Sequence, residues 1–124
     1  MKILLVDDDV FLRDMYGTKF SDAGHVVVVA DGGSSALREL SQADDFDVVL
    51  TDLIMPGMSG TDLINAIKQE LPEIDTKVTI IVLSNQSEDE AVLAARELGV
   101  TDYIIKSQFI PSEVVARVEE IMSR

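Results

Sequence analysis

The chain has 124 residues, enough for one domain with a hydrophobic core, and its 47% hydrophobic content argues against disorder. No apolar run approaches the roughly 20 residues of a membrane span, and the absence of Cys excludes disulfides and thiol chemistry. The net charge is -13, with 23 acidic and 10 basic residues. Nucleic-acid binding relies on Lys and Arg, so we expect no binding to DNA or RNA. A metal cation or a basic protein suits the negative charge better as a partner. We also expect a cytoplasmic protein that does not bind a membrane.

Short apolar runs alternate with amphipathic stretches along the whole chain. Near-continuous Val, Ile and Leu in such runs is typical of strands that are buried on both faces of a parallel sheet. The expected strands cover residues 2–6, 26–29, 48–51, 78–83 and 100–105, and the expected helices cover 10–22, 33–41, 60–70, 87–98 and 111–123. Five strand–helix repeats predict a single α/β domain over residues 1–124, of the doubly wound (βα)5 type with helices on both faces of a five-stranded sheet.

The ends of the predicted helices carry local signals. Ser87 and Glu90 form a capping-box pattern at the start of the fourth helix. Gly24 and Gly99 each follow a helical stretch, where a left-handed backbone conformation costs glycine least. Pro111 suits the first turn of the last helix, because its missing N–H would be unpaired there anyway.

Carboxylates follow two of the predicted strands at their C-terminal ends. Asp7 and Asp8 come directly after the first strand, and Asp52 follows the third strand just before a turn with Pro56 and Gly57. In an open α/β sheet, ligands bind at the carboxyl ends of the strands. Because clustered carboxylates resist joint ionisation, they need a cation or shared protons. The sequence therefore predicts a divalent-metal site that brings an anionic group to Asp52.

Several nearby residues also have a purely structural interpretation. Asp9 is expected to cap the following helix, because Asp is a favoured N-cap. Ser84 is compatible with a simple strand end, and Tyr103 with a half-buried strand aromatic. Lys106 lies at the tip of a buried strand, where a fully solvated side chain is the weaker interpretation. His25 has no Cys or second His near it, so we do not expect it to bind a metal.

A series of motifs in chain order resembles the receiver domain of the two-component response regulators, and the resemblance covers the whole chain. The matching positions are the acidic pair Asp7 and Asp8, the acceptor Asp52 with the turn residues Met55, Pro56, Met58 and Gly60, the hydroxyl residue Ser84, and Tyr103 and Lys106. The resemblance implies a flavodoxin-like fold with strand order 2-1-3-4-5. It also implies a phosphoacceptor signalling domain that is not an enzyme, apart from helping its own phosphorylation and slow autodephosphorylation.

The resemblance further implies a metal and a phosphodonor. Asp8 and Asp52 would bind Mg²⁺ directly, with Mn²⁺ as a substitute, together with the backbone carbonyl of Ile54, and Asp7 would act through a bound water. Asp52 would attack the phosphorus of a phosphohistidine on a sensor histidine kinase or a histidine phosphotransfer protein. The product would be an acyl phosphate.

The same resemblance implies a switch. Lys106 and Ser84 would bind oxygens of the phosphoryl group, and Tyr103 would move into the space that Ser84 leaves. This movement would reshape the surface of the fourth helix, the fifth strand and the fifth helix. Output would then follow from docking to a downstream protein or from a fused output domain.

The chain departs from the family pattern at two positions. Ser107 follows Lys106 where the family usually has proline, and we expect a trans peptide bond there because a cis bond costs serine several kcal/mol. Asn85 replaces a small residue and is expected to narrow access to the phosphoryl group. The resemblance also implies that Ile54 and Gln86 occupy variable positions of the family that tune dephosphorylation. Because an apolar Ile54 cannot orient a hydrolytic water, we predict a fairly long-lived phosphoaspartate.

Two other functions remain open from the sequence. One is a degenerate receiver that binds a protein without phosphate, which an Asp52→Asn substitution with unchanged partner binding would support. The other is a phosphatase of the haloacid dehalogenase type, with Asp7 as nucleophile and Asp9 as acid. Phe11 stands where that family expects Thr or Val, and the chain is short for it. Phosphate on Asp52 rather than on Asp7 would separate the receiver from the phosphatase.

Overall fold

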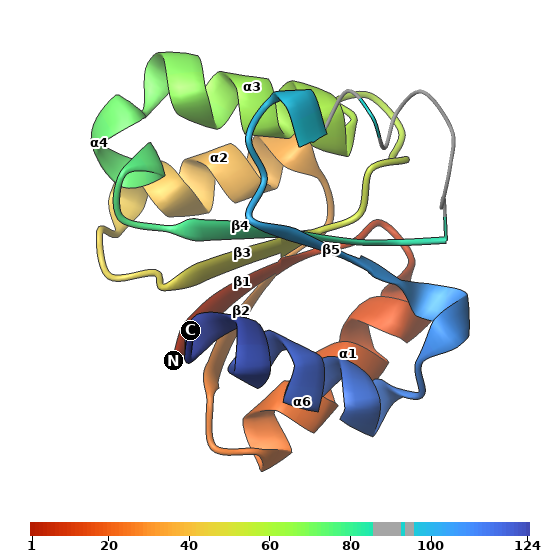
Figure 1. Ribbon diagram of the computed structural model, residues 1–124. Helices are drawn as coiled ribbons and strands as arrows, with labels where there is room; N and C mark the ends of the chain where they lie inside the picture. The colour runs from red at the N-terminus through yellow and green to blue at the C-terminus, as the bar shows by residue number, and fades with distance from the viewer. Residues whose placement is uncertain (86–92, 94–95) are drawn as a thin grey trace.

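The computed structural model describes residues 1–85, 93 and 96–124, and there a five-stranded parallel sheet lies between two layers of helices (Figure 1). The strands are β1 (Lys2–Val6), β2 (Val26–Ala30), β3 (Val48–Thr51), β4 (Thr79–Ser84) and β5 (Asp102–Ile105). The α-helices are α1 (Val10–Asp22), α2 (Gly33–Gln42), α3 (Gly60–Glu70), α4 (Pro72–Asp75) and α6 (Pro111–Met122), and a 3-10 turn, η1, covers Lys106–Gln108.

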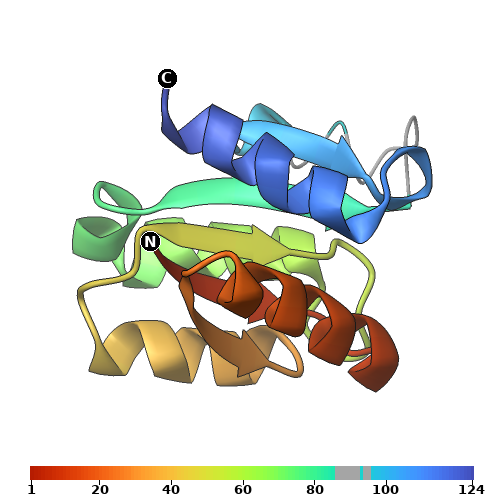
Figure 2. The same cartoon turned by 90° about the horizontal axis from the view of Figure 1, so that it is seen from below.

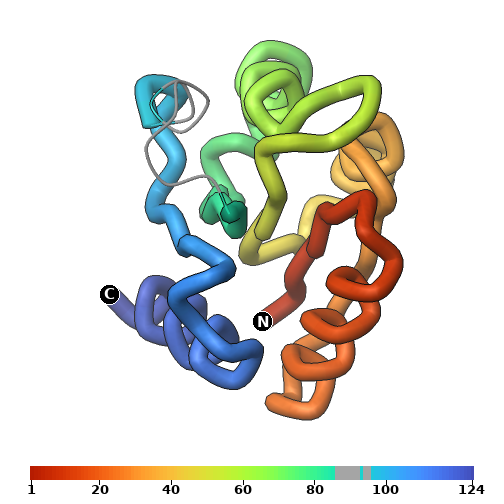
Figure 3. Tube along the Cα trace, turned by 90° about the vertical axis from the view of Figure 1, so that its right-hand side faces the viewer, coloured from red at the N-terminus to blue at the C-terminus, as the bar shows by residue number. Residues whose placement is uncertain are grey.

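The strands follow the order β2-β1-β3-β4-β5, and every neighbouring pair is parallel. This order confirms the predicted topology. The inner strands β1, β3 and β4 are buried along almost their whole length, as their continuous apolar sequences predict, whereas β2 at one edge is more exposed. Because all strands run the same way, their carboxyl ends meet at one edge of the sheet, which faces the viewer in Figure 3.

Each face of the sheet carries its own hydrophobic cluster. Side chains alternate across a strand, so Leu4 and Val6 of β1 belong to one cluster, and Ile3 and Leu5 belong to the other. The first cluster is covered by α2 and α3, and the second by α1 and α6, which lie nearest the viewer in Figure 2. The helix residues that close the clusters are Ala36, Leu40, Leu63, Ile64 and Ile67 on one face and Tyr16, Phe20, Val114, Val118 and Ile121 on the other.

The predicted helix ends are confirmed where the structure describes them. Gly24 and Gly99 have φ angles of 94° and 83°, in the left-handed region that favours glycine. Pro111 opens α6 at its first position. The predicted Ser87–Glu90 capping box and Gln86 lie outside the described residues, as does most of the predicted helix 87–98. In that range the described residues 93, 96 and 97 are helical.

The structure adds one helix that the sequence pattern did not predict. The short helix α4 follows α3 after a single residue, Leu71, and Pro72 opens it with a backbone angle already suited to a helix. Lys68 of α3 pairs with Asp75 of α4 at 3.2 Å. Strand boundaries differ from the predicted ones by one or two residues, which is within the usual fraying of element ends. None of the helices in the described part of the chain has the length and apolar character needed to cross a membrane.

Candidate functional site

The site begins where β1 and β3 end. Val6 is in register with Thr51, so the residues that follow them, Asp7 and Asp52, leave neighbouring strands side by side. The Asp52 N–H donates to the Val6 carbonyl at 3.1 Å, which holds the two strand ends together. One carboxylate oxygen from each of Asp7, Asp8 and Asp52 lies within 4.8 Å of the other two. The structure thus brings together the three carboxylates that the sequence predicted.

Lys106 places an ammonium group between two of these carboxylates. Its Nζ donates to Asp7 Oδ2 and to Asp52 Oδ2, both at 2.9 Å. The Lys106 side chain is 6% exposed, so the charge is nearly removed from water. Burial by itself would lower the pKa of Lys106, but the hydrogen bonds to Asp52 and Asp7 outweigh it and hold the pKa above its ordinary value. The ammonium therefore stays charged at neutral pH and neutralises part of the acidic cluster.

The carboxylate of Asp52 is oriented by its own loop. Its Oδ1 accepts hydrogen bonds from the backbone N–H groups of Leu53 at 2.7 Å and Ile54 at 3.3 Å, while Oδ2 faces Lys106. Such bonds favour the ionised carboxylate and fix its direction. The Asp52 side chain is 14% exposed, against 3% for Asp7. Asp52 is therefore the more accessible of the two acids that bind Lys106.

The loop after Asp52 turns back tightly and starts α3. A Cβ added to Gly60 would clash with the Asp52 carbonyl oxygen and would lie 2.7 Å from the Leu53 Cα, so only glycine fits. The Gly60 N–H donates to the Leu53 carbonyl at 2.8 Å. Ser59 caps α3 in a capping box with Asp62. This short path fixes the start of α3 against the backbone of the candidate acceptor.

The Asp7 side of the site is held by the start of α1. Asp9 accepts from the Leu12 N–H at 3.1 Å, which confirms its predicted role as the helix cap. The Asp9 N–H in turn donates to Asp7 Oδ1 at 2.9 Å. Arg13 Nη1 donates to the backbone carbonyl of Asp7 at 3.1 Å. Both oxygens of the Asp7 carboxylate are thus engaged, one by backbone and one by Lys106.

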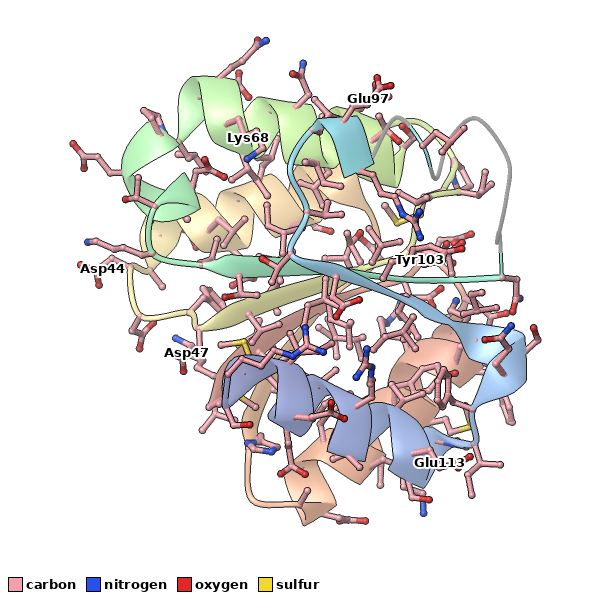
Figure 4. The ribbon with its side chains drawn as sticks, in the orientation of Figure 1. Asp44, Asp47, Lys68, Glu97, Tyr103 and Glu113 are labelled. Carbon is pink, nitrogen blue, oxygen red and sulfur yellow. The ribbon has the colours of Figure 1, made fainter. Side chains whose placement is uncertain are left out.

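Of the predicted phosphate-binding and switch residues, Ser84 ends β4, Tyr103 lies on β5, and Lys106 opens η1 directly after β5. Ser84 is buried at the C-terminal end of β4, in register with Ile105, the residue before Lys106. Tyr103 is half-buried on β5 and packs against the cluster under α2 and α3 (Figure 4). The Arg96 guanidinium lies 5.6 Å from the centre of the Tyr103 ring. Ser84 and Lys106 therefore reach the same edge of the sheet as the carboxylates.

The remaining predicted positions surround the site less closely. Ile54 is 56% exposed, and Asn85 is exposed directly after β4. Among the described residues all peptide bonds are trans, in agreement with the trans bond expected before Ser107. His25 lies away from the carboxylates, with Nε2 at 2.9 Å from Glu119 Oε2. It belongs to none of the metal-type clusters that the described residues form.

Two residues near the site escaped the sequence interpretation. Arg13 and Tyr16 lie one and two turns after the helix cap Asp9, on the inward side of α1. The pKa of Tyr16 is raised above its ordinary value, chiefly by burial, while the positive charge of Lys106 acts in the opposite direction. The spacing of four and seven residues from Asp9 was the available signal, because such positions share one helix face.

A comparison with protein families identifies one match. The model of the response regulator receiver domain matches residues 3–119. The DNA-binding response regulator MtrA of Mycobacterium leprae is 34% identical over 123 residues, which are 99% of this chain and 52% of that protein. The probable transcriptional regulator ycf27 of Guillardia theta is 33% identical over 99% of this chain and 46% of its own length. The chain thus spans about half the length of these relatives.

Solved structures with the same fold are also similar in sequence. The chemotaxis response regulator CheY4 of Vibrio cholerae has a TM-score of 0.86 and 28% identity, and the match covers 97% of both chains. A CheY-like response regulator receiver domain protein of Methanospirillum hungatei JF-1 has a TM-score of 0.83 and 31% identity, over 98% of this chain and 94% of that one. Both likenesses extend over nearly the whole chain.

Proposed function

Since this chain belongs to the family of response regulator receiver domains, we propose that Asp52 is its phosphoacceptor and takes a phosphoryl group from a phosphohistidine. An oxygen of the Asp52 carboxylate forms a bond to phosphorus while the bond from phosphorus to the imidazole nitrogen breaks, and the nitrogen keeps the electron pair. The observation that carries the assignment is the position of Asp52 beside Lys106 with a side chain that remains 14% exposed. The Asp7 side chain is only 3% exposed, so its carboxylate is less accessible to a phosphodonor than that of Asp52.

The proposal includes Mg²⁺ at Asp7, Asp8 and Asp52, together with the backbone carbonyl of Ile54, and Mn²⁺ is a chemically similar substitute. The donor set supports this, because three carboxylate oxygens within 4.8 Å of one another are the hard ligands that Mg²⁺ prefers. Asp8 is exposed, which leaves room for the water ligands that Mg²⁺ keeps. When bound, Mg²⁺ supplies positive charge that offsets the carboxylates and the incoming phosphoryl oxygens.

Lys106 and Ser84 would then bind oxygens of the phosphoryl group on Asp52. Lys106 already neutralises Asp52. When negative charge appears on the phosphoryl oxygens, its ammonium can shift from Asp52 to one of these oxygens while it keeps its hydrogen bond to Asp7. The Ser84 hydroxyl, at the same edge of the sheet, would donate to a second phosphoryl oxygen. Tyr103 is the proposed switch residue, and its movement would alter the surface of β5 and the neighbouring helices. The phosphorylated arrangement is selected only to the extent that phosphate binds it better.

The lifetime of the phosphorylated state depends on residues around Asp52. Ile54 is 56% exposed beside the acceptor and carries no group that could orient an attacking water. Asn85 is exposed at the end of β4 and is proposed to restrict access. Gln86, the third tuning position, lies outside the described residues. We therefore expect slow autodephosphorylation, and a half-life of seconds in vitro would contradict this expectation.

The partners follow from the family. A receiver domain implies a histidine kinase, and a histidine phosphotransfer protein is an equivalent donor in our proposal. We also propose that output passes through a downstream protein or through a further domain of a longer protein, since the chain spans about half the length of its relatives. We assign no nucleic-acid binding to residues 1–124, whose net charge is -13. We propose that the phosphoryl transfer to Asp52 takes place in the cytoplasm.

The decisive experiment is the intact mass of the protein after incubation with a small-molecule phosphodonor, with and without Mg²⁺. We expect a Mg²⁺-dependent gain of one phosphoryl group in the native chain and in Asp14→Asn, an exposed acid on α1. Asp52→Asn should gain none. Phosphorylation that persists in Asp52→Asn would refute the acceptor assignment. No gain with either a small donor or a histidine kinase would favour a phosphate-independent binding module.

A further inference from the structure

A groove lies at the opposite end of the molecule from the carboxylates. It consists of two adjoining hollows of about 520 Å³ and 270 Å³, which share the residues Ser41, Glu70 and Leu71. The larger hollow is formed by the end of α2, the loop that follows it, the end of α3 and the short helix α4. We call this feature the α2–α4 groove. In Figure 1 these elements meet beside the label of α4, at the amino ends of the strands.

The floor of the α2–α4 groove is apolar. Leu40 is 1% exposed and belongs to the hydrophobic cluster beneath α2 and α3. Ala43, Leu71 and Ile74 are half-buried and pack against the same cluster. Leu37 extends the apolar lining into the smaller hollow. An apolar side chain bound here would therefore continue the hydrophobic core outward.

The rim of the larger hollow is acidic. Asp44, Glu70 and Glu73 are exposed, and the described lining of this hollow contains no Lys or Arg. The smaller hollow adds one exposed basic residue, Arg38, so acidic residues outnumber basic ones around the groove. Figure 4 shows the Asp44 side chain projecting from the loop after α2, at the end of the molecule where α4 lies. The neighbouring Asp45 and Asp75 differ, because each pairs with a lysine of this chain. The three rim carboxylates make no such ion pair within the described residues.

We propose that the α2–α4 groove binds a basic amphipathic segment of a partner protein. A large apolar side chain of that segment would occupy the floor, and flanking Lys or Arg side chains would pair with the rim carboxylates. The charge pattern selects this occupant. A second copy of the chain would bring another net charge of -13 against the acidic rim, and nucleic acid would bring phosphates against it. This proposal does not depend on phosphorylation of Asp52.

The test uses a short synthetic peptide in which Leu alternates with Lys, titrated into the isotope-labelled 124-residue protein and followed by backbone amide NMR. We expect chemical-shift changes to concentrate at Leu40, Ala43, Leu71 and Ile74. A matched peptide with Glu in place of Lys should bind far more weakly. Shifts spread evenly over the acidic surface, or centred elsewhere, would overturn the proposal.

Charge-neutral variants separate a specific groove from general attraction to an acidic protein. Glu73→Gln removes one rim charge, and Glu97→Gln removes one exposed charge that does not line the groove (Figure 4). We expect Glu73→Gln to weaken peptide binding about threefold at low salt, the size of an exposed ion pair, and Glu97→Gln to leave it unchanged. Equal weakening by the two variants would overturn the proposal. Because both residues are exposed, neither variant should alter folding.

Discussion

The substitution Lys106→Met removes the ammonium that lies 2.9 Å from both Asp7 and Asp52 but keeps a long unbranched side chain. The two carboxylates are 3% and 14% exposed, so without Lys106 their charges stay in a poorly solvated place. Removal of one partner from a buried pair typically costs about 3–5 kcal/mol of unfolding free energy. Because Asp52 is partly solvated, we expect the lower end of that range, about 3 kcal/mol, in the absence of Mg²⁺.

Urea denaturation at neutral pH measures this loss. With a urea dependence of about 1.5 kcal/mol per molar, the midpoint of the Lys106→Met variant should fall by about 2 M. Saturating Mg²⁺ should restore part of the loss, because a cation bound by Asp7, Asp8 and Asp52 replaces the missing positive charge and stabilises the folded state by mass action. The stabilisation by Mg²⁺ should therefore be larger in the variant than in the native chain.

Lys68→Met is the matched control. Lys68 pairs with Asp75 at 3.2 Å, but the two side chains are 30% and 25% exposed. A pair of this kind contributes up to about 1 kcal/mol, so the control should lose much less stability than Lys106→Met and should not respond differently to Mg²⁺. Equal losses in the two variants, or a Lys106→Met variant that Mg²⁺ does not restore, would refute the reasoning.

Three further outcomes are expected. Mg²⁺ should raise the melting temperature of the native chain, and Asp8→Ala should abolish that rise and stabilise the metal-free form by a few tenths of a kcal/mol, which calorimetry can resolve. Gly60→Ala should lower the free energy of unfolding, measured in urea, by about 1–3 kcal/mol and should slow phosphorylation, because the added Cβ would meet the Leu53 backbone. Gly32→Ala is the control, because open space surrounds Gly32, and it should change neither property. Because the pKa of Lys106 is raised on folding, its contribution to the free energy of unfolding is complete below pH 10.5, the ordinary pKa of lysine, and is lost as the pH rises through the folded-state pKa. The difference in stability between the native chain and Lys106→Met should therefore stay constant up to about pH 10 and shrink above it.

The sequence alone was sufficient for the strands and for the edge of the sheet at which the carboxylates lie. Short continuous runs of Val, Ile and Leu identify buried parallel strands, because no other element of that length buries both of its faces. A charged residue directly after such a run must lie at the strand tip, and parallel strands bring their tips to one edge. These rules place Asp7, Asp8 and Asp52 at the same edge of the sheet, whereas the strand order that makes β1 and β3 neighbours was implied only by the resemblance to receiver domains. The cap at Asp9 follows from local backbone chemistry alone.

The tertiary structure decided what those carboxylates contact. Lys106 is 99 residues from Asp7 and 54 from Asp52 in sequence, and only the packing of β5 beside β4 directs its ammonium between them. The α2–α4 groove exists because α4 folds back after α3, a step too short to leave a periodic signal. Local patterns specify which elements form, whereas side-chain direction and surface shape arise from contacts between distant residues.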